Sequence, residues 1–148
     1  MSLCNLPYAI LRSPLEQMIA DDEGYRCHLY RCSAGKITIG YGYNLEAGMP
    51  EDEAMVLTRY RLSKLEAALI RRLPWFGKLD DRRKAALINM AYQMGIDGLL
   101  KFSRMLAACA AGNWDEAHAQ AMDSKWATVD CPKRAARVAG MLLEPQEE

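Results

Sequence analysis

The pattern of hydrophobic and polar positions first predicts a short helix near the N-terminus. The segment from Ser13 to Gly24 opens with a capping residue and a proline, carries its apolar side chains on one side, and stops at a glycine. This pattern places Glu23 on the last turn of the helix. A carboxylate gains nothing from the negative end of a helix dipole, so the position favours the protonated form of an acid.

The next segment alternates in the way expected of an antiparallel hairpin. RCHLYRC and KITIGYGYN are rich in β-branched and aromatic residues, and residues 33–35 form a turn between them. If KITIGYGYN is one strand, one of its faces carries Ile37, Ile39 and Tyr41. The opposite face then carries the smaller residues Thr38, Gly40 and Gly42. The glycines either leave space for a bulky group to approach the Thr38 face or mark a bulge.

Helical periodicity dominates the remainder of the chain. Residues 51–73 have acids in the first turn, arginines in the last, and leucines spaced three, four and four residues apart. A second long helix starts at Asp80 or Asp81 and closes at Gly95. After a short turn, further helices are predicted over 103–112, 114–124 and 132–143. The sequence therefore predicts an α+β fold that is mostly helical.

Composition and charge narrow the function classes. At 148 residues the chain suits one compact domain, and 19 basic residues balance 19 acidic ones, so nucleic acid is not expected as the main partner. Basic residues gather in 56–72 and 131–138, either as solvated helix faces or as a surface for an anionic polymer. With no long apolar run and no basic start, we expect neither stable membrane insertion nor export by an ordinary signal.

Five cysteines form an odd set without the paired spacing of metal ligands. This usage is typical of a reducing compartment rather than of a disulfide framework, although Cys27 and Cys32 could approach each other across the hairpin. A zinc site from Cys27, His28 and Cys32 lacks a fourth ligand at a familiar interval. We expect no metal and no cofactor.

The candidate chemistry lies where the first helix meets the hairpin. Cys32 follows Glu23 by nine residues, and Thr38 follows Cys32 by six. In an inverting glycosidase one acid protonates the leaving oxygen while a second group, roughly 6.5–9.5 Å away, guides a water. A thiol is a poorer base than a carboxylate, and Cys32 could instead be a small apolar filler. Thr38 could orient the water or be an ordinary strand threonine.

Other assignments remain open from the residues alone. A thiol nucleophile paired with His28 or His118 would make a peptidase or amidase, although Cys27 and His28, as sequence neighbours, would point to opposite faces of a strand. Gln93, on the predicted helix that closes at Gly95, could bind a sugar amide or simply decorate a surface. The three tryptophans are expected to pack in the core.

Together these segments resemble the phage-type lysozymes, the endolysins of glycoside hydrolase family 24. The motif of that family, Glu, eight residues, Asp or Cys, five residues, Thr, is matched by Glu23, Cys32 and Thr38. Further similarity lies in GKITIGYGYNL, ALINMAYQMG, WDEA and SKWATVDCPKRAARV, and the resemblance covers roughly residues 13–143. It implies a small hairpin lobe (about 13–50), a connecting helix (about 51–73) and a helical lobe (about 74–143) flanking a substrate cleft.

By this resemblance the protein is a muramidase that cuts the β-1,4 bond between N-acetylmuramic acid and N-acetylglucosamine. Glu23 would be the general acid, Cys32 would occupy the slot more often held by aspartate, and Thr38 would help to place water. In the family an arginine of the C-terminal segment reaches the catalytic glutamate, and Arg134 and Arg137 occupy matching positions. The residues expected to bind substrate are Tyr43, Asn44, Gln93, Arg134 and Arg137.

The expected setting follows from the same resemblance. The partner is bacterial peptidoglycan, the enzyme is a monomer in the cytoplasm of the host bacterium, and a separate membrane-permeabilising protein of the holin type gives access to the wall. Two alternatives stay open: a peptidoglycan-binding module without catalysis, and a lytic transglycosylase that cuts the same bond by internal cyclisation.

Overall fold

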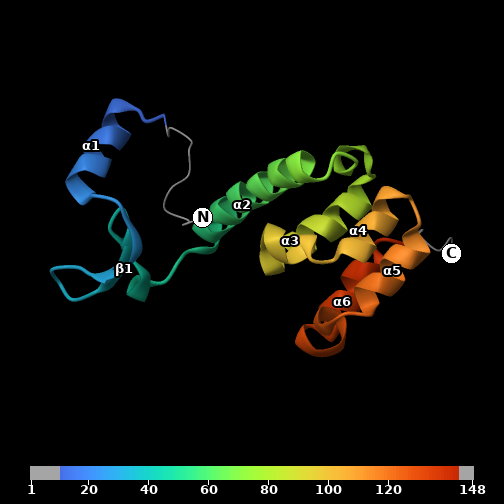
Figure 1. Ribbon diagram of the computed structural model, residues 1–148. Coiled ribbons are helices and arrows are strands. Elements are labelled where there is room, and N and C mark those ends of the chain that lie inside the picture. The colour runs from blue at the N-terminus through green and yellow to red at the C-terminus, as the bar shows by residue number, and fades with distance from the viewer. Residues whose placement is uncertain (1–10, 144–148) are drawn as a thin grey trace. The chain divides into compact units, whose positions relative to one another are not determined.

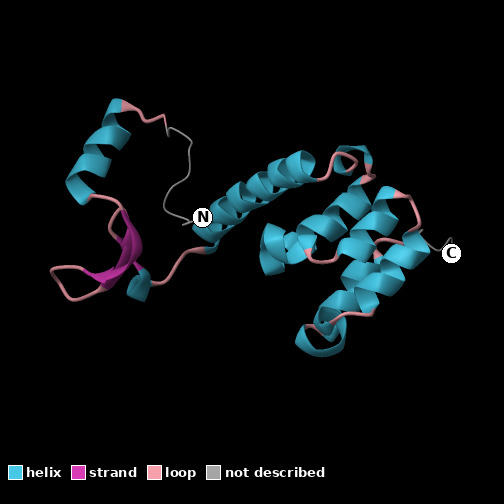
Figure 2. Ribbon diagram, viewed as in Figure 1, coloured by secondary structure: helices cyan, strands magenta, loops and turns pink. Residues whose placement is uncertain are grey.

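Two compact units make up the chain, residues 1–54 and 55–148, in the computed structural model, which describes residues 11–143 (Figure 1). Within those residues the strands β1 (Arg26–Arg31), β2 (Ile37–Gly40) and β3 (Tyr43–Asn44) all belong to the first unit, as Figure 2 shows. The second unit is helical. The predicted fold class, α+β and mostly helical, is confirmed.

Capping explains where the first helix begins and ends. α1 (Pro14–Glu23) starts after Ser13, whose hydroxyl accepts a 3.3 Å hydrogen bond from the Glu16 N–H, while the Glu16 carboxylate accepts one of 2.6 Å from the Ser13 N–H. The pKa of Glu16 is lowered from its ordinary value, mainly by the hydrogen bond with the Ser13 backbone and next by the one with the Ser13 side chain. Gly24, at φ 67°, ends the helix. The predicted helix, with Glu23 on its last turn, is confirmed.

The sheet differs from the simple hairpin predicted. Its order is β1-β2-β3 with antiparallel neighbours, and Thr38 pairs with both Tyr30 and Asn44. The prediction of one strand through KITIGYGYN is wrong, because β2 ends at Gly40 and the chain turns before β3. Gly40, the last residue of β2, and Gly42 have φ values of 67° and 77°, which turn the chain out of the extended conformation.

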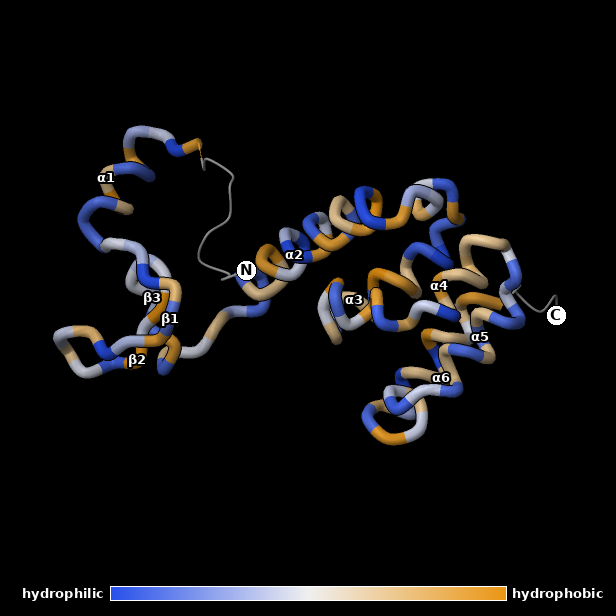
Figure 3. The backbone as a smooth tube through the Cα atoms, in the orientation of Figure 1, coloured by the Kyte–Doolittle hydropathy of each residue, from blue (hydrophilic) through white to orange (hydrophobic). Residues whose placement is uncertain are grey.

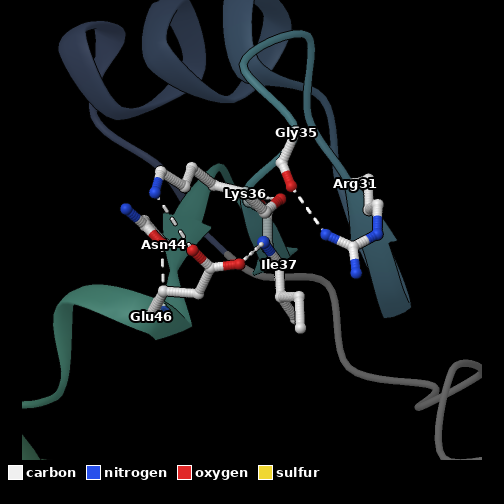
Figure 4. A network of polar contacts seen from close by, with 7 residues as sticks. Arg31, Gly35, Lys36, Ile37, Asn44 and Glu46 are labelled. Atoms are coloured by element: carbon white, nitrogen blue, oxygen red, sulfur yellow. Dashed lines mark hydrogen bonds and ion pairs between the residues drawn. The ribbon is translucent and has the colours of Figure 1, made fainter.

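A polar network fastens the end of the sheet. Glu46, in the short 3₁₀ helix η1 (Leu45–Ala47), accepts a 3.1 Å hydrogen bond from the Ile37 N–H and forms a 3.2 Å ion pair with Lys36 (Figure 4). The Asn44 side chain in turn accepts a 3.0 Å bond from the Glu46 N–H. Across the turn between β1 and β2, Arg31 donates a 2.8 Å bond to the Gly35 carbonyl. These contacts fix β2 between its two neighbours.

Helices follow one another through the rest of the chain. They are α2 (Glu51–Arg72), the short η2 (Phe76–Lys78), α3 (Asp81–Leu100), α4 (Ser103–Ala110), α5 (Trp114–Met122), the π-helical segment η3 (Trp126–Asp130) and α6 (Pro132–Gly140). The five predicted helices of this half are confirmed, and η3 was not predicted. No helix within residues 11–143 combines the length and the apolar character that a membrane crossing requires.

The second long helix shows one correct and one wrong expectation. Asp80 is its N-cap and accepts a 3.0 Å bond from the Arg83 N–H. The helix does break at Gly95, which has φ 77° and ψ 164°. The following residues, predicted as a turn, are helical as far as Leu100, because burial of Leu99 among other core residues rewards a second helical segment.

The core of the second unit is apolar and fully closed. Leu69 of α2, Leu87 and Met90 of α3, and Val138 of α6 are among its completely buried side chains. Figure 3 shows orange, hydrophobic stretches along these helices. Arg82 and Arg83 of α3 donate to the carbonyl of Gly140, the last residue of α6, and to those of Leu142 and Leu143 beyond it, which ties the start of α3 to the end of α6.

Replacing Leu87 by alanine tests this core. The side chain is 0% exposed, so Leu87→Ala should lower the free energy of unfolding by about 2–5 kcal/mol, measured by urea denaturation. Ile70→Ala on α2 is the matched control, because Ile70 is 51% exposed, and it should cost under about 1 kcal/mol. Equal losses would contradict the assignment of Leu87 to the core.

Candidate active site

Glu23 is exposed at the end of α1, and its carboxylate lies against the backbone at Gly42. A Cβ atom built on Gly42 would come within 2.5 Å of Oε2 and 3.3 Å of Cδ of Glu23. Within residues 11–143, no hydrogen bond or ion pair ties this carboxylate to another residue. The structure therefore brings the predicted acid to the turn that follows β2 and leaves its oxygens available.

Cys32 and Thr38 lie together at the turn between β1 and β2. The Cys32 N–H donates to the Lys36 carbonyl at 3.0 Å, which closes the turn. Hydrogen bonds from the backbone at Lys36, then from the backbone at Ala34, then from the Thr38 hydroxyl hold the pKa of the Cys32 thiol below its ordinary value. The thiolate is thereby favoured beyond what an isolated cysteine would give.

Thr38 is the most enclosed of the predicted site residues. It is 2% exposed, and its hydroxyl donates a 2.9 Å hydrogen bond to the Lys36 carbonyl. The sequence placed this residue on a small polar face open to a bulky group. In the structure the space beside the glycines of that face is taken by the chain itself, by the Glu23 carboxylate at Gly42 and by the Tyr43 ring at Gly40.

Two residues predicted to bind substrate, Tyr43 and Asn44, follow the turn, and they differ in how far their side chains are already engaged within the protein. Tyr43 is 63% exposed, and the edge of its ring lies 3.0 Å from the position of a Cβ on Gly40. Asn44 already caps η1 through its side-chain oxygen, which accepts from Glu46. Its amide nitrogen is the group left to meet a ligand.

Gln93 on α3 is engaged at both ends of its amide. Its oxygen accepts a 3.0 Å bond from the Trp126 indole N–H, and its nitrogen donates to the Cys131 sulfur at 2.8 Å. Trp126 also meets Phe102 edge-on, with ring centroids 6.1 Å apart. Gln93 thus connects α3 to η3 and to the start of α6, which the sequence alone did not indicate.

Arg134 is held in place, whereas Arg137 is exposed on the same helix. The Arg134 Nε donates to Asn89 Oδ1 at 2.9 Å and its Nη2 donates to the Asn89 carbonyl at 3.3 Å, so α6 is tied to α3. Arg134 and Asn89 line a groove of about 610 Å³ together with Leu62 and Tyr92, and Arg137 is not part of its lining. Sequence reasoning missed the role of Asn89 because its partner lies 45 positions away.

The cysteines other than Cys32 have separate environments. Cys27 is disulfide-bonded, whereas Cys32, Cys109 and Cys131 are free thiols, which excludes the Cys27–Cys32 pairing. Burial raises the pKa of Cys109 to about 11. In the part of the chain that the structure describes, no cluster of three His, Cys, Asp or Glu side chains could hold a metal ion, so the zinc alternative has no ligand set there.

Comparison with known proteins agrees with a lysozyme-like α+β enzyme. The family model for phage lysozyme matches residues 20–143. Probable T4-type lysozyme 2 of Dictyostelium discoideum is 26% identical over 156 residues, covering 85% of this chain and 91% of that protein. Probable T4-type lysozyme 1 of the same organism is 25% identical over 160 residues, covering 88% and 94%.

A viral relative is also similar. The pre-baseplate central spike protein Gp5 of Enterobacteria phage T4 is 27% identical over 158 residues, covering 87% of this chain but only 27% of that protein. The present chain therefore spans about a quarter of the spike protein and nearly all of the Dictyostelium lysozymes. The chain belongs to the phage lysozyme family, which confirms the expected enzyme class, a glycoside hydrolase acting as a lysozyme.

Alkylation rates test the environment of the Cys32 thiol. Because the thiolate is the reactive form, Cys32 should be labelled by iodoacetamide at lower pH than Cys109, whose pKa is raised to about 11. Mass spectrometry of peptides after labelling at about pH 6 to 9 measures both rates. Thr38→Val removes the hydroxyl bond at similar volume and should shift Cys32 labelling to higher pH. Unchanged labelling in that variant would contradict the contact.

Proposed function

We propose that this lysozyme hydrolyses the β-1,4 bond between N-acetylmuramic acid and N-acetylglucosamine with Glu23 as the general acid. The observation that carries the assignment is the position of the Glu23 carboxylate, exposed and seated on Gly42 in the unit that also holds Cys32 and Thr38. A general acid must reach the leaving oxygen, and this carboxylate is not committed to another described group.

The proposed reaction balances with two groups of the protein and one water. Protonated Glu23 transfers its proton to the glycosidic oxygen as the bond from that oxygen to C1 breaks. Water attacks C1, and its proton passes to the Cys32 thiolate, whose formation the surrounding hydrogen bonds favour. Exchange of protons with solvent then restores both groups.

Thr38 is proposed to act through Cys32. Thr38 is 2% exposed, and its hydroxyl donates to the Lys36 carbonyl. The same hydroxyl contributes to the lowered pKa of the Cys32 thiol, so it is better placed to hold Cys32 than to meet a sugar. We therefore assign Thr38 as a positioning residue, which affects the placement of water indirectly, through Cys32.

We also propose that the remaining predicted residues bind substrate, although their side chains differ in how much hydrogen-bonding capacity or exposed surface they have left. Tyr43 offers an exposed ring for stacking on a sugar, and Arg134 and Arg137 offer positive charge for the carboxylates of a peptidoglycan strand. Asn44 and Gln93 retain only the hydrogen-bonding capacity left by their contacts within the protein.

The cellular setting is a proposal that rests on family membership. We infer a monomer that reaches bacterial peptidoglycan from the host cytoplasm once a holin-type protein has permeabilised the membrane. Such a protein is needed in that setting because the wall lies beyond the membrane. A non-catalytic binding module and a lytic transglycosylase are the outcomes against which the assay is designed.

Product analysis of digested sacculi tests the reaction. The unmodified enzyme should release new reducing ends, and Glu23→Gln should lower kcat by about 10²–10⁴-fold because the proton donor is lost. Asp22→Asn, the neighbouring exposed acid on the same helix, is the matched control and should keep activity. Binding to sacculi without new ends would identify a binding module, and products lighter by one water would identify a transglycosylase.

Substitution of Cys32 separates a proton acceptor from a filler. Cys32→Ala should lower kcat by about 10²-fold or more, because water attack loses its base. Cys32→Asp supplies a carboxylate in the slot where the family motif allows one, and it should keep kcat within about tenfold of the parent enzyme. Equal activity of the alanine and aspartate variants would show that Cys32 only fills space.

A further inference from the structure

The turn after β2 is fastened to both ends of α1. Tyr41, which lies between Gly40 and Gly42, accepts a 2.5 Å hydrogen bond from Arg12, just before the helix, and its ring meets that of Tyr25, just after it, at a centroid distance of 5.4 Å. The Arg12 guanidinium also lies 5.6 Å from the centre of the Tyr41 ring. These contacts bring the Gly42 backbone up to the helix end that carries Glu23.

No side chain fits at position 42 while Glu23 keeps its place. The Cβ of any other residue would lie 2.5 Å from Glu23 Oε2, whereas ordinary van der Waals contact begins at 3.4 Å. The φ of 77° is a second reason for glycine, since L-residues rarely adopt it. The carboxylate therefore occupies the space that a side chain would fill.

We propose that Gly42 is a positioning residue of the reaction: its bare backbone leaves the space, called the seat below, that the Glu23 carboxylate occupies, and this inference rests on the proposed role of Glu23 as the general acid. A methyl group at position 42 would push Oε2 away by about 0.9 Å, the difference between 3.4 and 2.5 Å. A displacement of about 1 Å of a catalytic group can cost about 10²-fold in rate.

The test compares alanine at two glycines with similar φ values. Gly42→Ala should lower kcat on solubilised peptidoglycan by about 10–100-fold with little change in KM, because a displaced acid affects the chemical step rather than binding. Gly48→Ala is the control: Gly48 has φ 80°, and a Cβ there would meet nothing within 4 Å. Its kcat should stay within about threefold of the parent. Equal losses in kcat for the two variants would overturn the proposal.

A double-mutant cycle on the stability of the protein tests the contact between Gly42 and Glu23 without measuring activity. The loss in the unfolding equilibrium constant caused by Gly42→Ala should be smaller when Glu23 is also alanine, because the clash partner is gone. If Gly42→Ala alone does not fold, recovery of folding by Glu23→Ala supports the seat. A zero coupling contradicts it, and Gly48→Ala, at a similar φ with nothing within 4 Å of its Cβ, measures the part of the loss that comes from backbone strain alone.

The two proposals fail in different ways. If Glu23→Gln keeps full hydrolysis, the proposed function is wrong, while the stability cycle still reports whether the carboxylate rests on Gly42. If Glu23→Gln loses hydrolysis but Gly42→Ala behaves as Gly48→Ala does, the function stands and the seat is wrong.

Discussion

Contact between the end of α1 and the turn after β2 is the constraint on which the proposed chemistry depends. The helix ends at Gly24, so Glu23 is the last residue whose direction the helix dictates, and its carboxylate meets the Gly42 backbone. Tyr41 fastens the same turn through Arg12 and Tyr25. The proposed proton donor thus lies between the end of a helix and the backbone of a turn.

The second proposed catalytic group, Cys32, lies in the same unit, and hydrogen bonds rather than steric fit define its surroundings. Hydrogen bonding from the backbone at Lys36, then from the backbone at Ala34, then from the Thr38 hydroxyl lowers the pKa of the Cys32 thiol and favours its charged form. Since Thr38 pairs with residues of both β1 and β3, this hydroxyl is fixed by the centre of the sheet. The sheet is small, but its middle strand carries Thr38, which helps to lower the pKa of the Cys32 thiol.

Local signals in the sequence were sufficient for the helices and for the family motif. Ser13 and Asp80 cap helices as predicted, and Gly24 and Gly95 interrupt them as predicted. The glycines at positions 40 and 42 left a bulge open as an alternative, but the turn between β2 and β3 was not predicted, because the alternation of side chains is equally compatible with one strand and positive φ leaves no trace in hydrophobicity. The partners of Gln93 lie 33 and 38 positions away, so its engagement required the tertiary structure.

The two units are stabilised in different ways, and this bears on how the site responds to change. The helical unit encloses an apolar core, whereas among the described residues of the first unit only Thr38 is buried. The order of the first unit instead depends on the Glu46 contacts (Figure 4), on helix capping and on the contacts of Tyr41. Polar contacts at partly exposed positions are individually weak, so several must act together to hold a carboxylate within an ångström. Glycine at position 42 reduces that demand, because the carboxylate can approach the backbone without displacing a side chain.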